Sequence, residues 1–104
     1  MNKVLLIGNL TKSVEIRYTQ TGIAVANFTL AVKRETKNEE TDFINCIAYN
    51  KTAELISKYL DKGSKVSVDG RIQTGSYENK EGKKIYTTDV IVDKVEFLNS
   101  KKGD

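Results

Sequence analysis

The sequence predicts an all-β domain with one helix, in which five strands close into a Greek-key barrel. Short stretches in which apolar residues alternate with polar ones recur along the 104-residue chain, which is typical of strands that are buried on one side. A single segment, residues 51–61, carries apolar residues at helical spacing. Five long strands in a chain of this length would leave costly open edges, so we expect the sheet to close on itself.

Two strands are expected in the first third of the chain. Residues 4–7 are apolar and predict a buried strand, and the Gly8-Asn9 pair after them predicts a bend. In residues 14–18 apolar and charged side chains alternate, which predicts a half-exposed strand that continues the first one. After a turn, residues 23–33 form the clearest long strand.

A polar loop, a strand and the helix are expected in the middle of the chain. Residues 34–41 are wholly polar and predict an exposed hairpin loop, and residues 42–49 predict the third strand. We expect the helix over residues 51–61 to follow an N-cap at Asn50. Gly63 is expected to end it as the C′ residue.

The last third predicts two more strands joined by a hairpin. Residues 66–72 form the fourth strand. Residues 75–84 are polar, and residues 81–84 within them predict the hairpin tip. Residues 85–98 form the fifth strand, in which the apolar pattern shifts phase before Val95. Residues 99–104 are a short polar tail, which leaves residues 1–98 as one domain.

The order of these elements favours one barrel topology. The helix falls between the third and fourth of five strands, and a Greek-key barrel with that plan is the oligonucleotide/oligosaccharide-binding fold, or OB-fold. An SH3-like barrel or an open meander would fit the number of strands. Neither would fit the position of the helix as well.

The residue types that are missing exclude several functions. The chain has no histidine and one cysteine, Cys46, so it has no Ser-His-Asp triad, no His/Cys zinc site and no internal disulfide. No cofactor and no catalytic motif are expected, so an enzyme is disfavoured. No apolar stretch approaches the length of a membrane span, which predicts a cytoplasmic protein. The net charge of +3 permits an anionic partner without requiring one.

Three aromatic residues are candidates for binding rather than for packing. Phe43 and Tyr49 share a strand face with Asn45, a residue that a core face would not usually carry, and Tyr77 lies in a polar hairpin. Two interpretations stay open: Phe43 in the core with Tyr49 capping the barrel, and Tyr77 packed on its own hairpin. The remaining candidates for core or interface positions are Tyr18, Phe28, Tyr59, Tyr86 and Phe97.

Basic residues accompany these aromatics along the chain. Lys33, Arg34 and Lys37 border the polar loop, Lys51 and Lys62 flank the helix, and Arg71 lies on the fourth strand. Lys51 and Lys62 also fit ordinary helix-end charges. Aromatic rings stack on bases, whereas Lys and Arg neutralise phosphates. The combination therefore points to single-stranded nucleic acid.

Several motifs resemble the bacterial single-stranded DNA-binding protein family. The similar stretches occur in collinear order from Met1 to about Leu98 and are residues 2–10, 16–22, 24–31, 42–46, 59–64, 68–74 and 86–90. The resemblance implies an OB-fold DNA-binding domain over residues 1–98. It also implies a homotetramer, with a dimer left open, that coats single-stranded DNA in replication, recombination or repair.

The resemblance also implies roles for individual residues. Phe43, Tyr49 and Tyr77 match the family's base-stacking positions, and basic positions carry over to Lys51, Lys62 and Arg71. Two positions depart from the family. Thr36 stands near a usual aromatic position in a shortened loop, and Gly75 stands where many relatives have arginine. The chain also stops before an acidic tip, so we expect tail-dependent replication and repair partners to be lost.

Two other binding functions remain possible. The departures at Thr36 and Gly75 and the modest net charge favour an OB-fold adaptor that binds proteins and contacts DNA weakly. An oligosaccharide-binding barrel would favour tryptophan in its loops, and the chain has no tryptophan. The adaptor is therefore the main alternative.

Overall fold

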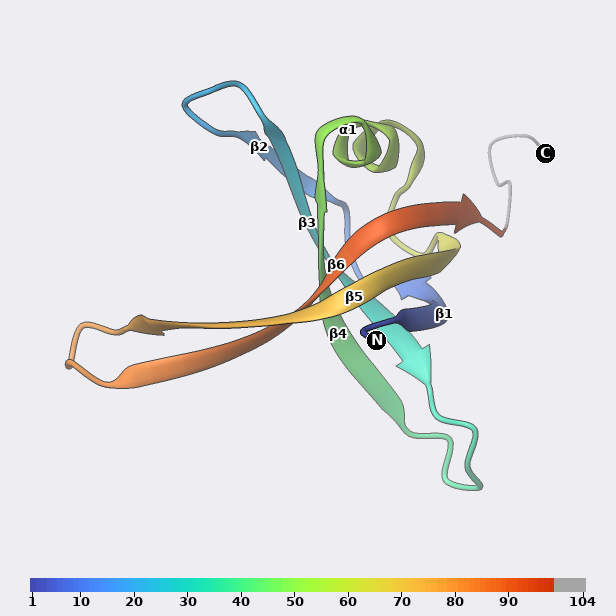
Figure 1. The fold of residues 1–104 in the computed structure, drawn as a ribbon. Coiled ribbons are helices and arrows are strands. Elements are labelled where there is room, and N and C mark those ends of the chain that lie inside the picture. The colour runs from blue at the N-terminus through green and yellow to red at the C-terminus, as the bar shows by residue number, and fades with distance from the viewer. Residues whose placement is uncertain (99–104) are drawn as a thin grey trace.

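The computed structural model describes residues 1–98, and the tail expected at 99–104 lies outside the described residues. Six strands and one helix follow each other along the chain (Figure 1). They are β1 (Val4–Leu10), β2 (Glu15–Tyr18), β3 (Ala24–Lys33), β4 (Thr41–Tyr49), α1 (Asn50–Tyr59), β5 (Lys65–Glu78) and β6 (Lys84–Phe97). The predicted all-β class with one helix is confirmed.

The sheet closes as a barrel because β1 has a partner on each side. The strand order is β1-β5-β6-β4-β3-β2, and β1 also pairs with β3. Pairing is antiparallel except between β4 and β6. Strands β1 and β2 run one after the other beside β3: Leu10 pairs with Leu30, and Glu15 pairs with Asn27. Together they form one interrupted strand, as predicted, so the barrel has five strands.

The predicted bend at Gly8-Asn9 is the place where the barrel closes. Asn9 pairs with Lys65 of β5 and with Ala31 of β3. At Gly8, a Cβ atom would overlap the carbonyl oxygen of Ala31. Glycine is needed here because β1 approaches the β3 backbone too closely for any side chain.

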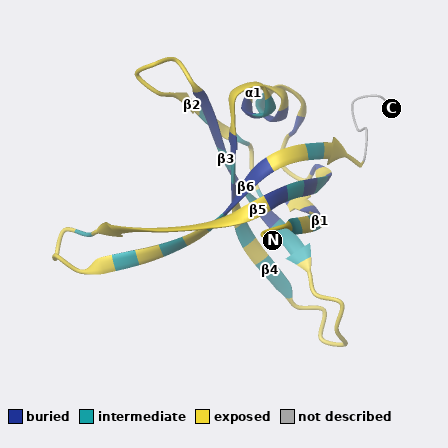
Figure 2. Ribbon diagram, viewed as in Figure 1, coloured by how far each residue is buried: buried dark blue, intermediate teal, exposed yellow. Residues whose placement is uncertain are grey.

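The core fills the barrel with inward-facing residues from the strands and from α1. Leu30, Ile56, Val66 and Val68 are fully buried, and Ala53 and Ile56 place the apolar side of the helix against the barrel. Phe28 is also buried, as expected. Figure 2 shows the buried residues gathered where the strands cross beneath α1. Burial raises the pKa of the Cys46 thiol to about 12, so Cys46 packs as an unreactive apolar group.

Both predicted ends of the helix were wrong. Asn50 belongs to α1 with a φ of 58°, the N-cap position is Tyr49, and no side chain caps the helix. The C-cap is Leu60, so Gly63 lies beyond the C′ position. Gly63 has a φ of 88° in a turn that Ser64 closes by donating its N–H to the Asp61 carbonyl. This turn is also held against the barrel, because the Gly63 N–H donates a hydrogen bond to the carbonyl of Leu10 at the end of β1.

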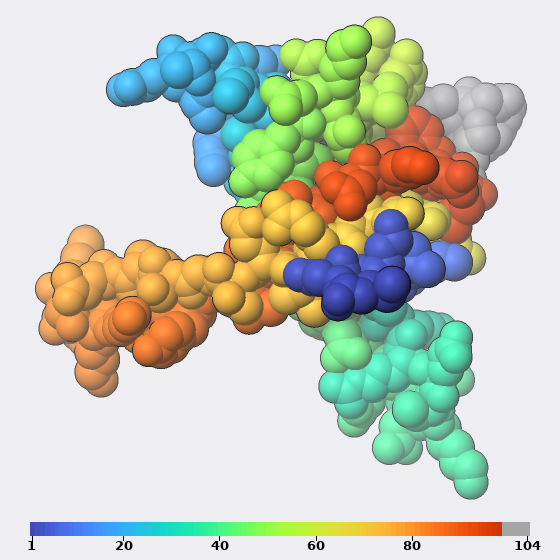
Figure 3. Space-filling view, in the orientation of Figure 1, coloured from blue at the N-terminus to red at the C-terminus, as the bar shows by residue number. Residues whose placement is uncertain are grey.

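Strands β5 and β6 extend beyond the barrel as a two-stranded arm, made of residues 73–78 and 84–89 with the turn between them. Residues 71–78 are all exposed. The fourth strand is therefore longer than the predicted residues 66–72, because β5 continues to Glu78. In the turn, the Asn79 side chain accepts hydrogen bonds from the N–H groups of Glu81 and Lys83, each at 2.9 Å. The arm and the β3–β4 hairpin project on different sides of the body (Figure 3).

The predicted phase shift in the last strand is confirmed. Asp69 of β5 pairs with Lys94, but the next residue, Gly70, pairs with Val92. Asp93 is therefore the extra residue of a β-bulge. A bulge changes the parity of the strand, which explains why the apolar pattern shifts between Val92 and Val95.

Candidate nucleic-acid interface

The register of β3 and β4 defines an outward-facing surface. Alternate residues of β4, among them Cys46 and Ala48, are buried in the barrel. The residues between them face outward and pair with outward residues of β3: Phe43 with Ala31, Asn45 with Thr29, and Ile47 with Asn27. Because cross-strand partners lie on the same side of a sheet, these side chains form one patch.

The same surface continues across β6 onto the arm. Ile47 pairs with Ile91 of β6, so Asp89, Thr87 and Ile85 lie on the outward side by alternation. Their β5 partners are Gln73, Gly75 and Tyr77. We call the outward side of β3, β4 and the arm the outer face. Phe43, Tyr49 and Tyr77 all lie on it.

The three aromatic rings on the outer face are open to solvent. Phe43 is 67% exposed, Tyr77 is 57% exposed and Tyr49 is 40% exposed. Phe43 is therefore not a core residue, and the prediction of alternate faces in residues 42–49 is confirmed. Phe43 and Tyr49 are six residues apart on one strand, or roughly 20 Å. That separation leaves room for several nucleotides between the two rings.

Most of the predicted basic residues are exposed around this surface. Lys33 ends β3 next to Thr41, Lys51 lies in the first turn of α1 and Lys62 follows the helix. Arg71 stands at the base of the arm and donates from Nη1 to the Gln73 Oε1 at 2.9 Å. By alternation, Lys33 and Arg71 lie on the outer face, whereas Lys51 and Lys62 lie at the two ends of the helix.

Arg34 differs because two carboxylates hold its guanidinium. Its Nε and Nη2 atoms lie 3.0 and 2.8 Å from oxygens of Asp42, and Nη1 pairs with Glu40. The hydrogen bond from Arg34, aided by its charge, lowers the pKa of Asp42. The sequence did not predict that Asp42 and Glu40 would bind the guanidinium of Arg34.

Four aromatics that were expected in the core or at interfaces are exposed in this chain. Tyr86 is 74% exposed and lies on the opposite face of the arm from Tyr77, with the Lys84 ammonium 5.6 Å from its ring centroid. Tyr59 and Phe97 contact each other with ring centroids 6.1 Å apart. Tyr18, on β2, is 60% exposed. None of the four belongs to the outer face.

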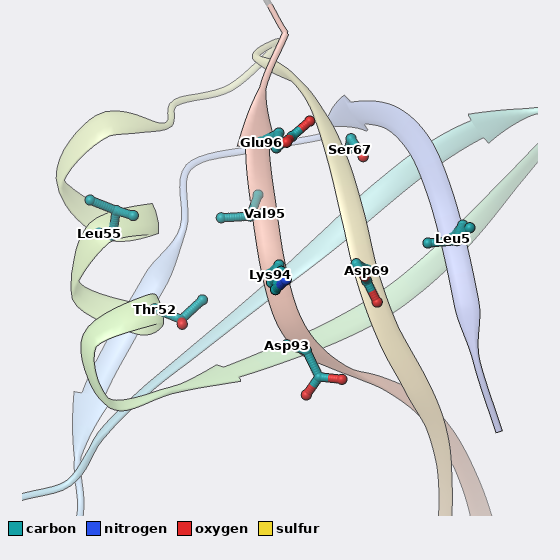
Figure 4. Close-up of a pocket in the computed structure, with 9 residues that line it drawn as sticks. All are labelled: Leu5, Thr52, Leu55, Ser67, Asp69, Asp93, Lys94, Val95 and Glu96. Carbon is teal, nitrogen blue, oxygen red and sulfur yellow. The ribbon is translucent and has the colours of Figure 1, made fainter. Parts of the chain in front are cut away.

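A second surface has the opposite character. A cavity of about 480 Å³ lies between α1, β1, β5 and β6, with Leu5 and Leu55 among its apolar lining residues (Figure 4). Asp69, Asp93 and Glu96 also line it, with Lys94 as the only cation. Because carboxylates repel phosphates, this cavity is a poor path for nucleic acid. The outer face is the better candidate.

The described residues were compared with two other kinds of functional feature, a metal site and a membrane-spanning helix. No group of three His, Cys, Asp or Glu side chains within residues 1–98 is arranged to hold a metal ion. In the same part of the chain, no helix has the length and apolar character needed to cross a membrane. The outer face carries exposed aromatic rings together with the basic residues Lys33 and Arg71.

Comparison with known proteins identifies the family. Residues 1–98 match the model of the single-strand binding protein family. The chain is 53% identical to the single-stranded DNA-binding protein of Clostridium perfringens, with 99% of this chain and 69% of that protein covered. It is 50% identical to single-stranded DNA-binding protein 3 of Listeria innocua, with 99% and 67% covered. It is also 50% identical to single-stranded DNA-binding protein 1 of Staphylococcus aureus, with 100% and 69% covered. The chain therefore belongs to the single-strand binding protein family, whose members bind DNA and are not enzymes.

Proposed function

We propose that residues 1–98 form a domain that coats single-stranded DNA largely without regard to sequence. The main support is the placement of Phe43, Tyr49 and Tyr77 as exposed rings on one continuous outer face. Each ring can stack on a base, with a contribution of about 1–3 kcal/mol. Because every base has a flat face, stacking of this kind is tolerant of sequence.

Phosphate contacts supply the second part of the proposed mechanism. Lys33 and Arg71 lie on the outer face, and Lys51 and Lys62 lie at the ends of the helix. Each phosphate that these residues neutralise releases counterions. Arg34 contributes only after it exchanges its carboxylate partners for a phosphate. We therefore expect the logarithm of affinity to fall with the logarithm of salt concentration, by about 0.7 for each phosphate contacted.

We propose further that the domain assembles as a homotetramer and acts in DNA replication, recombination or repair at the nucleoid. Leu5 and Ile7 support assembly, because they leave apolar surface of β1 71% and 56% exposed. Coating needs no ATP, since binding of the single strand draws the duplex–strand equilibrium towards the single strand. Sedimentation equilibrium tests the assembly, and we expect the mass of a tetramer. The mass of a dimer would replace the tetramer by a dimer, and a monomer at all concentrations would contradict assembly.

Fluorescence anisotropy with a labelled poly-dT oligomer tests DNA binding directly. An oligomer of roughly 35 nucleotides would span several OB-fold sites, and an equally long duplex serves as competitor. We expect tight, salt-sensitive binding that the duplex does not displace. Binding no tighter than to duplex would contradict the proposal and favour the protein-binding adaptor.

A further inference from the structure

The exposed side of α1 carries a row of lysines. Lys51 and Lys58 are seven residues or about two helical turns apart, so they lie on the same side of the helix, about 10 Å apart along its axis. The buried residues of α1, Ala53 and Ile56, face the barrel instead. Lys62 comes three residues after the helix ends. We call Lys51, Lys58 and Lys62 the lysine row.

The lysine row is available to an anionic partner. Within residues 1–98, none of its three lysines forms an ion pair with a carboxylate. Two carboxylates lie near the row. Glu54 is exposed in the middle of the helix, and Asp61 Oδ1 accepts hydrogen bonds from Ser13 Oγ at 3.1 Å and from the Lys62 N–H at 3.2 Å. Three cations beside two carboxylates leave a positive balance, which attracts phosphates.

An aromatic ring that can hold a base lies in the last turn of α1. Tyr59 is 51% exposed, and its ring lies beside that of Phe97, with centroids 6.1 Å apart and an angle of 46° between the planes. This contact joins the helix to the end of β6 (Figure 1). The Lys58 Nζ atom lies over the Tyr59 ring, 5.3 Å from its centroid. Because a lysine side chain is flexible, a base can take the place of this ammonium.

The lysine row begins where the outer face ends. Tyr49, the last ring of the outer face on β4, is also the N-cap residue of α1 and precedes Lys51 by two residues. The helix has ten residues and is about 15 Å long. Neither the lysine row nor Tyr59 lines the acidic cavity. A DNA strand that leaves Tyr49 can therefore follow the lysine row to Tyr59.

We propose that Tyr59 is a further base-stacking site of this chain, reached along a phosphate-binding row formed by Lys51, Lys58 and Lys62. The inference rests on the proposed coating of single-stranded DNA and extends the path of that DNA from β4 along α1. When a base stacks on Tyr59, the Lys58 ammonium leaves the ring and pairs with a neighbouring phosphate. Both contacts tolerate any sequence, as on the outer face.

A tryptophan at residue 59 tests the contact directly. The chain has no tryptophan, so Tyr59→Trp carries a single indole and keeps a ring beside Phe97. The matched control is Tyr86→Trp, because Tyr86 is also exposed with a lysine ammonium near its ring but lies on the far side of the arm. We expect a saturating dT oligomer to quench the indole fluorescence of Tyr59→Trp and to leave that of Tyr86→Trp unchanged.

Two further variants measure what the site contributes to affinity. Tyr59→Ala should weaken binding of a dT oligomer at least about fivefold, the lower end for one stacked base. Tyr59→Phe keeps the ring and should bind as the wild type does. Lys58→Gln should lower the log–log slope of affinity against salt by about 0.7, for one phosphate contact. Since Tyr59 contacts Phe97, chemical denaturation checks that each variant is folded in the assay.

Each other outcome overturns the inference at a defined point. An indole at residue 59 that is not quenched, or equal quenching at residue 86, would refute the stacking site on α1. Wild-type affinity in Tyr59→Ala would refute its contribution and leave single-strand binding intact. If the wild type does not bind the oligomer, the proposed function fails, and the inference with it.

Discussion

The barrel interior and the outer face are built from alternate residues of the same strands, yet they serve different purposes. Along β3 and β4, Leu30 and Cys46 are buried, whereas Phe43 is 67% exposed. Interior residues stabilise the closed sheet, and outer-face residues leave apolar surface in water without benefit to folding. This difference predicts that stability and DNA binding can be changed separately by substitutions on one strand.

The largest effect is expected from the interior. Leu30→Ala should lower the free energy of unfolding by about 2–5 kcal/mol, because Leu30 is fully buried and its removal leaves a cavity. Chemical denaturation measures the loss. DNA affinity per folded molecule should stay unchanged. A stability change below about 1 kcal/mol would show that Leu30 is not part of a tightly packed core.

The outer face should behave in the opposite way. Phe43→Ala should weaken binding of a dT oligomer by about 1–3 kcal/mol through loss of one stacking ring. The free energy of unfolding of this variant should change by no more than about 0.5 kcal/mol, as for other exposed positions. Parallel anisotropy and denaturation measurements separate the two effects. Lower stability with unchanged affinity would make Phe43 a structural residue.

A smaller effect is expected where the outer face meets the β3–β4 hairpin. Asp42→Asn removes one of the two carboxylates that hold Arg34 and opens its Nε and Nη2 atoms to a phosphate, so the salt dependence of binding should steepen by about 0.7 in the log–log slope. The same substitution in an Arg34→Ala background should not steepen the slope. An equal gain in both backgrounds would mean that the carboxylate acts by general repulsion.

The smallest effect concerns stability against pH. Because Arg34 lowers the pKa of Asp42, this pair stabilises the fold above the unfolded pKa of Asp, about 3.9. The contribution is lost as the pH falls through the lower folded value. Both side chains are nearly half exposed, so the effect should be slight. Denaturation at acidic and neutral pH should show a slightly smaller pH dependence for Asp42→Asn than for the wild type.

Periodicity in the sequence predicts which residues of a strand share a face and where a bulge interrupts the alternation. It does not predict contacts that depend on loop conformation or on strand pairing. Alternation in residues 42–49 placed Phe43 and Tyr49 on one face, and the phase shift before Val95 revealed the bulge at Asp93. The extension of β5 from residue 73 to Glu78 was missed because ladder hydrogen bonds need no apolar pattern. The partners of Arg34 were missed because they depend on the conformation of a loop. The continuation of the outer face onto the arm depends on the β4–β6 pairing, which joins segments distant in the chain.

One comparison tests most directly whether the outer face is the binding surface. Tyr77 and Tyr86 are both exposed, and they lie on opposite faces of the same arm. Tyr77→Ala should weaken binding of a dT oligomer about fivefold to more than a hundredfold, whereas Tyr86→Ala should change it less than twofold. Equal losses in the two variants, or a larger loss for Tyr86→Ala, would contradict the assignment of DNA binding to the outer face.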